Sequence, residues 1–268
     1  MRIVTWNVNS LNARIDRVVE WLELMKPDVL CLQETKLSND DFPHSIFNDL
    51  GYATAHHGQG QWNGVAILSR VGLDDVALDF QDGEAPDVDA RIIWATCGGV
   101  RVASCYVPNG RSLDDDHYQY KLAWLDRLHA DLDMNTLPDQ PISVVGDFNI
   151  APDDRDVFAP KTHIGATHVS QAERDKLDAL ATWGLHDVFR DHHDESDLYS
   201  WWDYRDGNFH KRKGLRIDLI LSSAPVRERT QRVFVDRNAR KGKLPSDHAP
   251  VIADMVPLTE DKPKETAS

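Results

Sequence analysis

The stretch SDHAPVIADMV, residues 246–256, places two reactive side chains directly before a run of apolar residues. Asp247 and His248 come first, and the apolar run that follows is typical of a buried strand. A polar side chain at the end of a buried strand lies at the rim of a sheet, where it can meet a ligand. This stretch therefore predicts a sheet with an acid–imidazole pair at its rim.

Three further polar runs interrupt the ends of apolar strands in the same way. They are TWNVNS at 5–10, LQETK at 32–36 and GDFNIAP at 146–152. Each would bring a hard oxygen ligand or a proton acceptor to the rim of a sheet. Four such rims in one chain predict a single metal-assisted site that cleaves a phosphate ester.

Strand-like runs alternate with helical segments along the chain. Several of these runs are continuously apolar, which is typical of strands covered on both faces. The strand-like runs are residues 2–8, 28–34, 64–70, 91–97, 100–107, 142–149, 215–223 and 248–256. Together with the helices they predict an α/β sandwich, in which helices lie outside packed sheets.

Three helices are predicted from apolar residues at helical spacing. The first begins after Asn12, a suitable N-cap residue, and ends before Pro27. The second carries a leucine stripe over residues 122–132. The third begins at Ser170 and Glu173, which have the spacing of a capping box.

We expect one catalytic domain over residues 1–257, because no low-complexity linker divides the chain. The tail at 258–268 is polar and is expected to be disordered. No stretch approaches the roughly 20 apolar residues of a membrane span, and the N-terminus lacks the features of a signal peptide. The three cysteines are odd in number and lie in apolar runs, which predicts free thiols in a reducing cytoplasm.

The charge is distributed unevenly. The net charge of −14 argues against a protein that binds nucleic acid without specificity. Residues 205–243, however, contain twelve basic and four acidic residues, so this segment carries +8 and the remainder −22. Such a segment could hold a polyanion locally, although a solvated loop with scattered Arg and Lys would have the same composition.

Glu34 and Asn7 both follow apolar strands. A carboxylate at that point can hold Mg²⁺, which favours oxygen ligands. The amide oxygen of Asn7 could complete a metal shell, or its NH₂ group could hold a phosphate oxygen. Taken singly, Glu34 could equally be a surface residue paired with Lys36, and Asn7 could form an Asx-turn.

Asp147 and Asn149 lie two residues apart, so strand alternation sends both side chains to the same side. Asp147 could accept a proton from an attacking water molecule while Asn149 orients that water. The Gly-Asp-x-Asn-x-x-Pro pattern from Gly146 to Pro152 is also typical of a strand that passes into a turn. The pattern alone leaves both readings open.

His248 is predicted to pair with Asp218, which lies within the apolar strand LRIDLIL. A buried Asp is costly unless it is paired, and a His–Asp hydrogen bond would also raise the pKa of the imidazole. The resulting cation suits a phosphate, although the pair could be structural. Tyr106 and Asn109 could touch phosphate oxygens, while the PNG sequence at 108–110 is also a turn signal.

The aromatic residues Trp201, Trp202 and Tyr204 precede the basic segment. Aromatic side chains among Lys and Arg suit the binding of nucleotides, although Trp more often packs in a core. The chain contains no Walker motif, GxGxxG, HExxH, paired CxxC or GxSxG motif. Most nucleotide-binding, zinc-protease and serine-hydrolase functions are thereby excluded.

Eight motifs, in the same order along residues 1–257, resemble the exonuclease III family of abasic-site endonucleases, and most of all its bacterial members. This family is part of the deoxyribonuclease I-like superfamily. The motifs are TWNVNSLNAR (5–14), PDVLCLQETK (27–36), NGVAILS (63–69), YVPNG (106–110), GDFNIAP (146–152), SWWDYR (200–205), GLRIDL (214–219) and SDHAP (246–250). The resemblance implies a four-layer α/β sandwich, with two packed mixed β-sheets flanked by helices and one active site at their edge.

The resemblance also implies roles for particular residues. Glu34 would be the main ligand of Mg²⁺ or Mn²⁺, with Asn7 beside it and Asp247 as a second ligand. Asp147 would be the base or orienter of water, and His248 would contact the scissile phosphate. The remaining catalytic positions would be Tyr106, Asn109, Asn149 and Asp218, supported by Asn9, Asp28 and Lys36.

The implied activity is cleavage of duplex DNA 5′ to abasic sites, with 3′–5′ exonuclease and 3′-phosphatase activity. A monomer is the default expectation. Trp201, Leu215 and Ile217 would line a pocket for the flipped abasic sugar. Other DNA contacts would come from Arg111, Lys211, Lys213 and Arg216. Two alternatives stay open: a phosphodiesterase of the same fold that acts on a non-DNA phosphate ester, and a catalytically silent DNA-binding protein. The segment 153–169 follows no recognisable pattern.

Overall fold

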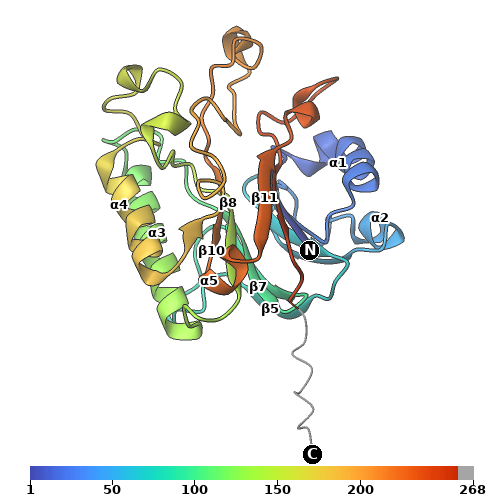
Figure 1. The fold of residues 1–268 in the computed structure, drawn as a ribbon. Helices are drawn as coiled ribbons and strands as arrows, with labels where there is room; N and C mark the ends of the chain where they lie inside the picture. Colours follow the sequence, from blue (N-terminus) through green and yellow to red (C-terminus); the bar gives the residue numbers. More distant parts are fainter. Residues whose placement is uncertain (259–268) are drawn as a thin grey trace, which may run out of the picture.

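The computed structural model describes residues 1–258 and consists of two packed β-sheets with helices on their outer sides (Figure 1). The predicted disordered tail at 258–268 lies outside the described residues except for Leu258.

The first sheet has six strands in the order β11-β12-β1-β2-β4-β3. The parallel pair β1–β2 lies at its centre, and the other pairs are antiparallel. The strands are β1 (Arg2–Asn7), β2 (Val29–Gln33), β3 (Ala53–His57), β4 (Val65–Ser69), β11 (Thr230–Val235) and β12 (Val251–Met255).

The second sheet also has six strands, in the order β5-β6-β7-β8-β10-β9. Its central pair β7–β8 is parallel, and the others are antiparallel. The strands are β5 (Asp74–Leu78), β6 (Ile92–Cys97), β7 (Val100–Tyr106), β8 (Ile142–Asp147), β9 (His186–Asp187) and β10 (Asp218–Ser222). Both sheets are therefore mixed, as predicted.

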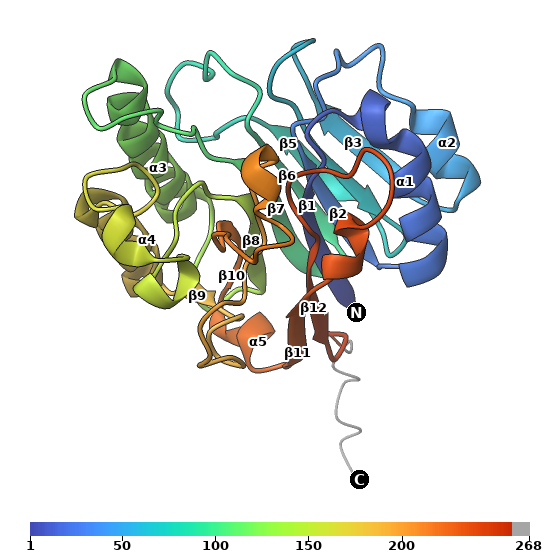
Figure 2. The same ribbon diagram turned by 90° about the horizontal axis from the view of Figure 1, so that it is seen from above.

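Helices cover the outer face of each sheet (Figures 1 and 2). The first sheet is covered by α1 and α2, and the second by α3 and α4. The helices are α1 (Leu11–Met25), α2 (His44–Asp49), α3 (Asp116–Asn135), α4 (Gln171–Trp183) and α5 (Ala224–Arg227), with 3₁₀ turns η1 (Asp154–Asp156), η2 (Pro160–Thr162), η3 (Arg205–Gly207) and η4 (Arg237–Arg240). The four-layer sandwich is thus confirmed.

The central strands are apolar because both of their faces are buried. In β1, Ile3 packs in the core between the two sheets, whereas the next residue, Val4, packs against α1. Successive side chains of a strand point to opposite faces, so both residues are fully buried. This explains why these strands read as continuous apolar runs.

All eight predicted strands are present, and they correspond to β1, β2, β4, β6, β7, β8, β10 and β12. The four strands that the sequence did not reveal are β3, β5, β9 and β11, which are the edges of the two sheets. An edge strand has less burial on either face, and β5 has no buried residue at all. Edge strands therefore lack the apolar signal of the central ones.

The helix ends agree with the sequence in part. Ser170 and Glu173 form the predicted capping box at the start of α4. The predicted N-cap Asn12 is wrong, because α1 begins at Leu11 and Ser10 is its N-cap. Within residues 1–258, no helix combines the length and the apolar character needed to cross a bilayer.

Candidate active site

The polar strand ends meet at one rim of the sandwich, at the upper end of the sheets in Figure 1. Asn7, Glu34 and Asp147 lie at or just after the ends of β1, β2 and β8. The antiparallel strands β10 and β12 begin at the same rim, where Asp218 lies directly opposite Asp147 and His248 precedes β12. The predicted convergence of these five side chains is confirmed.

Asn7 joins the two metal-ligand candidates. Its fully buried side-chain NH₂ group donates to Glu34 Oε1 at 2.8 Å and to Asp147 Oδ2 at 2.9 Å. Its oxygen accepts the backbone N–H of Asn9 at 2.9 Å. In this arrangement Asn7 aligns two carboxylates, and its predicted role as an oxygen ligand stays a prediction.

Glu34 follows β2 in a left-handed backbone conformation, with φ of 52°. Its Oε2 pairs with Lys36 Nζ at 2.9 Å, and Lys36 also donates to Asn9 Oδ1 at 2.7 Å. Glu34 therefore pairs with Lys36 and lies near Asp147 at the same time. By contrast, Asp28 lies at the other end of β2 and binds Arg70 at 3.0 Å, so its predicted supporting role in the site is wrong.

Asp147 is almost completely buried. Its Oδ1 accepts the backbone N–H of Asn149 at 2.9 Å, and its Oδ2 lies 3.7 Å from His248 Nε2. Burial raises the pKa of Asp147 to about 7; His248 opposes this rise, and Asp218 and Glu34 add to it. A carboxylate with such a pKa can accept a proton near neutral pH.

His248 is held by Asp218, whose carboxylate oxygens lie 3.0 and 2.9 Å from His248 Nδ1. Burial alone would lower the pKa of His248, but Asp218 and Asp147 outweigh burial and raise it to about 10. Ser200 Oγ accepts the backbone N–H of Asp218, and Ser246 Oγ accepts that of His248. The imidazole is therefore a fixed cation.

Asp247 lies apart from this group. Three side chains, those of Glu34, Asp147 and His248, offer ligand atoms within 4.8 Å of one another, and Asp247 is not among them. Its oxygens accept from Asn9 Nδ2 at 3.0 Å and from Trp201 Nε1 at 3.1 Å. Asp247 as a second metal ligand stays a prediction.

Tyr106 and Asn109 border the same site. Burial, together with the nearby charges of Glu34 and Asp147, raises the pKa of Tyr106 well above its ordinary value, so its hydroxyl stays a donor. The exposed Asn109 donates through Nδ2 to Asn149 Oδ1 at 3.1 Å. The side chain of Asn149 thus forms hydrogen bonds with Asn109 and with the backbone oxygen of Val107. Its predicted role was to orient the attacking water.

The predicted walls of an abasic-sugar pocket pack together. Leu215 and Ile217 form one buried apolar cluster with Ala151 and Val157. Trp201 packs against this cluster and pairs with both Leu215 and His248 through isolated bridges. These residues therefore lie beside His248, as a sugar-binding wall requires.

The prediction that Arg216 contacts DNA is wrong. Its side chain has no exposed surface and pairs with Asp156 at 2.6 Å and Asp187 at 2.7 Å. It lies inside the protein and cannot reach a phosphate. Arg111, Lys211 and Lys213 are exposed, so their predicted contacts with DNA are sterically open.

Lys121, a fully buried lysine in α3, was not predicted from the sequence as part of the site. Its Nζ donates to the backbone oxygen of Asn149 at 2.7 Å and pairs with the fully buried Glu173. Glu173 also accepts from Thr167 Oγ1 at 2.8 Å, and this tie anchors segment 153–169. A detectable signal existed, because Lys121 continues the apolar stripe of Leu125 and Leu128 at helical spacing.

We expect Lys121→Met to lower the free energy of unfolding by about 3 kcal/mol, because Glu173 would keep a buried charge without a cation. Urea denaturation measures the change. Lys176→Met, which breaks an exposed pair with Asp126, is the control and should cost no more than about 1 kcal/mol. Equal losses in the two variants would contradict the prediction.

The residues fit a hard divalent cation. Glu34 supplies carboxylate oxygens, which Mg²⁺ and Mn²⁺ prefer, and usually only one or two carboxylates are needed. A cation at Glu34 would also offset the cost of burying Asp147 beside two other carboxylates. His248 is a weak ligand candidate, since the cationic imidazole has no free lone pair.

Comparison with known proteins agrees with this geometry. Residues 4–248 match the model of the Endonuclease/Exonuclease/phosphatase family. Exodeoxyribonuclease III of Haemophilus influenzae is 33% identical, over 95% of this chain and 100% of that protein.

Two solved structures are also similar. An AP endonuclease from Archaeoglobus fulgidus has a TM-score of 0.92 and 35% identity, over 95% of this chain and 99% of that one. A 3′ phosphatase from Neisseria, bound to a product DNA hairpin, has a TM-score of 0.91 and 39% identity, over 96% and 99%. The predicted resemblance is confirmed, and the chain belongs to the Endonuclease/Exonuclease/phosphatase family.

Proposed function

We propose that the protein is a metal-dependent DNA-repair phosphodiesterase that cleaves duplex DNA 5′ to abasic sites and also processes 3′ ends as an exonuclease and phosphatase. One observation carries the proposal: Asn7, Glu34, Asp147, Asp218 and His248 converge from five strands on one rim. The relatives support it, since they include an exodeoxyribonuclease III, an AP endonuclease and a 3′ phosphatase.

The side chains suggest a division of labour. Asp147 accepts a proton from water, because burial places its pKa near 7. His248, kept cationic by Asp218, faces the negative charge that develops on the phosphate. Asn109 and Tyr106 would donate hydrogen bonds to phosphate oxygens, since Asn109 adjoins Asn149 and Tyr106 lies near Glu34 and Asp147.

A divalent cation would be held by Glu34, whose carboxylate Asn7 aligns, and Asp147 would stay free to accept the proton of water. We assign Mg²⁺ or Mn²⁺. Such an ion supplies polarisation of the phosphate and stabilisation of the leaving oxygen.

The abasic preference would come from the apolar wall of Trp201, Leu215 and Ile217. An abasic nucleotide has no base to unstack, so turning it out of the duplex costs less than for a normal nucleotide. This apolar wall beside His248 would pack against a bare sugar and would offer a base no polar partner.

Rates on three duplexes test the proposal: one with a central abasic site, one blunt and undamaged, and one with a 3′-phosphate. We expect the abasic duplex to be cut fastest, and EDTA to abolish every activity. An esterase rate on a phospholipid or inositol phosphate above all DNA rates would favour the other phosphodiesterase function. Binding without any incision would favour the silent DNA-binding protein.

We further propose a single catalytic domain over residues 1–257 that acts as a monomer in the cytoplasm. Both sheets supply site residues, which supports one domain. The three cysteines are buried free thiols, which supports a reducing compartment.

A further inference from the structure

Three basic side chains that lack acidic partners gather at one place on this acidic protein. Elsewhere in the basic segment, Arg205 pairs with Asp203, and Arg227 with Asp191. Within residues 1–258, no carboxylate forms an ion pair with Lys211, Arg212 or Arg237.

These three line one open pocket of about 380 Å³. Asp197 is its only acidic lining residue, and it accepts a hydrogen bond from the hydroxyl of Tyr199. The pocket thus carries an excess of two positive charges. Its residues are Phe158, Ser196, Asp197, Leu198, Tyr199, Trp202, Lys211, Arg212 and Arg237.

Aromatic rings hold Arg237 in place. The Arg237 guanidinium lies 5.4 Å from the centre of the Trp202 ring and 5.3 Å from that of Phe209. Trp202 and Phe209 pack edge to face at 5.1 Å. Burial and the like charge of Arg212 both lower the pKa of Arg237, which means that the two guanidinium groups repel each other. An anion between them would relieve this repulsion.

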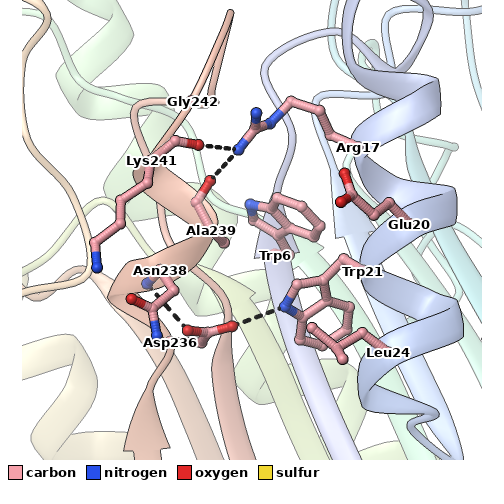
Figure 3. Close-up of a pocket in the computed structure, with 10 residues that line it drawn as sticks. All are labelled: Trp6, Arg17, Glu20, Trp21, Leu24, Asp236, Asn238, Ala239, Lys241 and Gly242. Carbon is pink, nitrogen blue, oxygen red and sulfur yellow. Dashed lines mark hydrogen bonds between the residues drawn. The ribbon is translucent and has the colours of Figure 1, made fainter.

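The loop that carries Arg237 is anchored by α1, which lies beside it (Figure 3). Arg17 donates to the backbone oxygens of Ala239 at 2.8 Å and Lys241 at 2.6 Å. Trp21 Nε1 donates to Asp236 Oδ2 at 2.9 Å. The position of Arg237 is therefore preorganised, which limits the entropy lost on binding.

The pocket lies directly behind a wall of the active site. Trp201 donates to Asp247 and packs beside His248, whereas the ring of the next residue, Trp202, lines the pocket. The backbone N–H of Trp202 binds Asp247 O at 3.0 Å, so the two sites share one segment. The loops that carry the cations project from the same end of the molecule as the active site (Figure 1).

We propose that Lys211, Arg212 and Arg237 form a second phosphate-binding site, which holds a backbone phosphate of DNA other than the scissile one. The inference rests on the proposed function and identifies residues that bind its DNA substrate. A chain with a net charge of −14 repels DNA, so binding needs local cations free of internal partners. The resemblance already points to Lys211 as a DNA contact, and the pocket adds Arg212 and Arg237 to it.

The test is a variant with Lys211→Gln, Arg212→Gln and Arg237→Gln. We expect KM for an abasic duplex to rise about 10-fold, with the loss in KM rather than in kcat. The slope of log Kd against log salt should fall by about 1, as for the loss of one phosphate contact. Circular dichroism and thermal melting confirm that the variant is folded.

The matched control carries Arg227→Gln, Arg229→Gln and Arg232→Gln. It removes the same charge from α5, β11 and the turn between them, away from the site rim. We expect its KM and salt slope to match the wild type. An unchanged salt slope in the first variant, or equal losses in both variants, would overturn the proposal.

Inhibition by inorganic phosphate tells whether the pocket binds a DNA backbone phosphate or a free phosphate. If only its inhibition constant changes in the first variant, and duplex binding does not, the pocket serves a free phosphate and the DNA assignment is wrong. Salt-dependent duplex binding is measured without turnover, so this test is decided even if the wild type proves to cleave no DNA.

Discussion

Asp147→Asn is expected to reduce the rate of abasic-site cleavage by about 10³-fold, within the usual 10²- to 10⁴-fold range for loss of a general base. The amide has nearly the same shape as the carboxylate but cannot accept the proton of the attacking water. Binding of the duplex should persist, because the exposed cations proposed to contact DNA are unchanged. Single-turnover rates and Kd on the same labelled duplex measure the two effects.

The control for this variant is Asp126→Asn, the same change at an exposed residue that pairs with Lys176. It should cleave at the wild-type rate. Wild-type turnover by Asp147→Asn would refute the assignment of Asp147. A loss of duplex binding equal to the loss of rate would show instead that Asp147 acts in binding.

Glu34→Gln is expected to be the second largest loss. The glutamine keeps an oxygen near Asn7 but removes the charge that attracts a divalent cation and pairs with Lys36. We expect half-maximal activity to require at least about 10 times more Mg²⁺, the lower end of the loss seen when metal-site residues change. Titration of activity with Mg²⁺, and calorimetry with Mn²⁺ alone, measure the change.

Glu20→Gln on the exposed side of α1 is the matched control and should leave the cation requirement unchanged. If Glu34→Gln binds Mn²⁺ as tightly as the wild type, the cation is held elsewhere. The site would then have to be sought around Asp247, the other predicted ligand.

The sequence revealed the central strands and missed the edges for a physical reason. A strand such as β8 is buried on both faces and reads as an apolar run, whereas the exposed β5 contains two acids and no buried residue. The candidate site residues were visible in the sequence because they follow or precede central strands. Their meeting depends on how the two sheets pack, since β1, β2 and β12 lie in one sheet and β8 and β10 in the other.

The errors concern residues whose partners are distant in the chain. Arg216 has the composition of a DNA contact, but Asp156 and Asp187 bury it as an ion pair. The helical stripe places Lys121 on the buried side of α3, but only the fold shows that Glu173, 52 positions away, pairs with it and makes it part of the site's support. The sequence gives the charge of each side chain. Whether that side chain is buried, and what it pairs with, depends on which segments pack together.

By itself, then, the sequence determined the central strands, the two sheets' helical cover and the residue types at the site rim. Only the tertiary structure decided that Asn7 bridges Glu34 and Asp147, that Asp218 keeps His248 cationic, and which basic residues stay free for a polyanion. The burial of a strand can be predicted locally, from the pattern of apolar residues along the sequence. Protonation and pairing depend on distances of a few ångströms between residues up to 140 positions apart, such as Asn7 and Asp147.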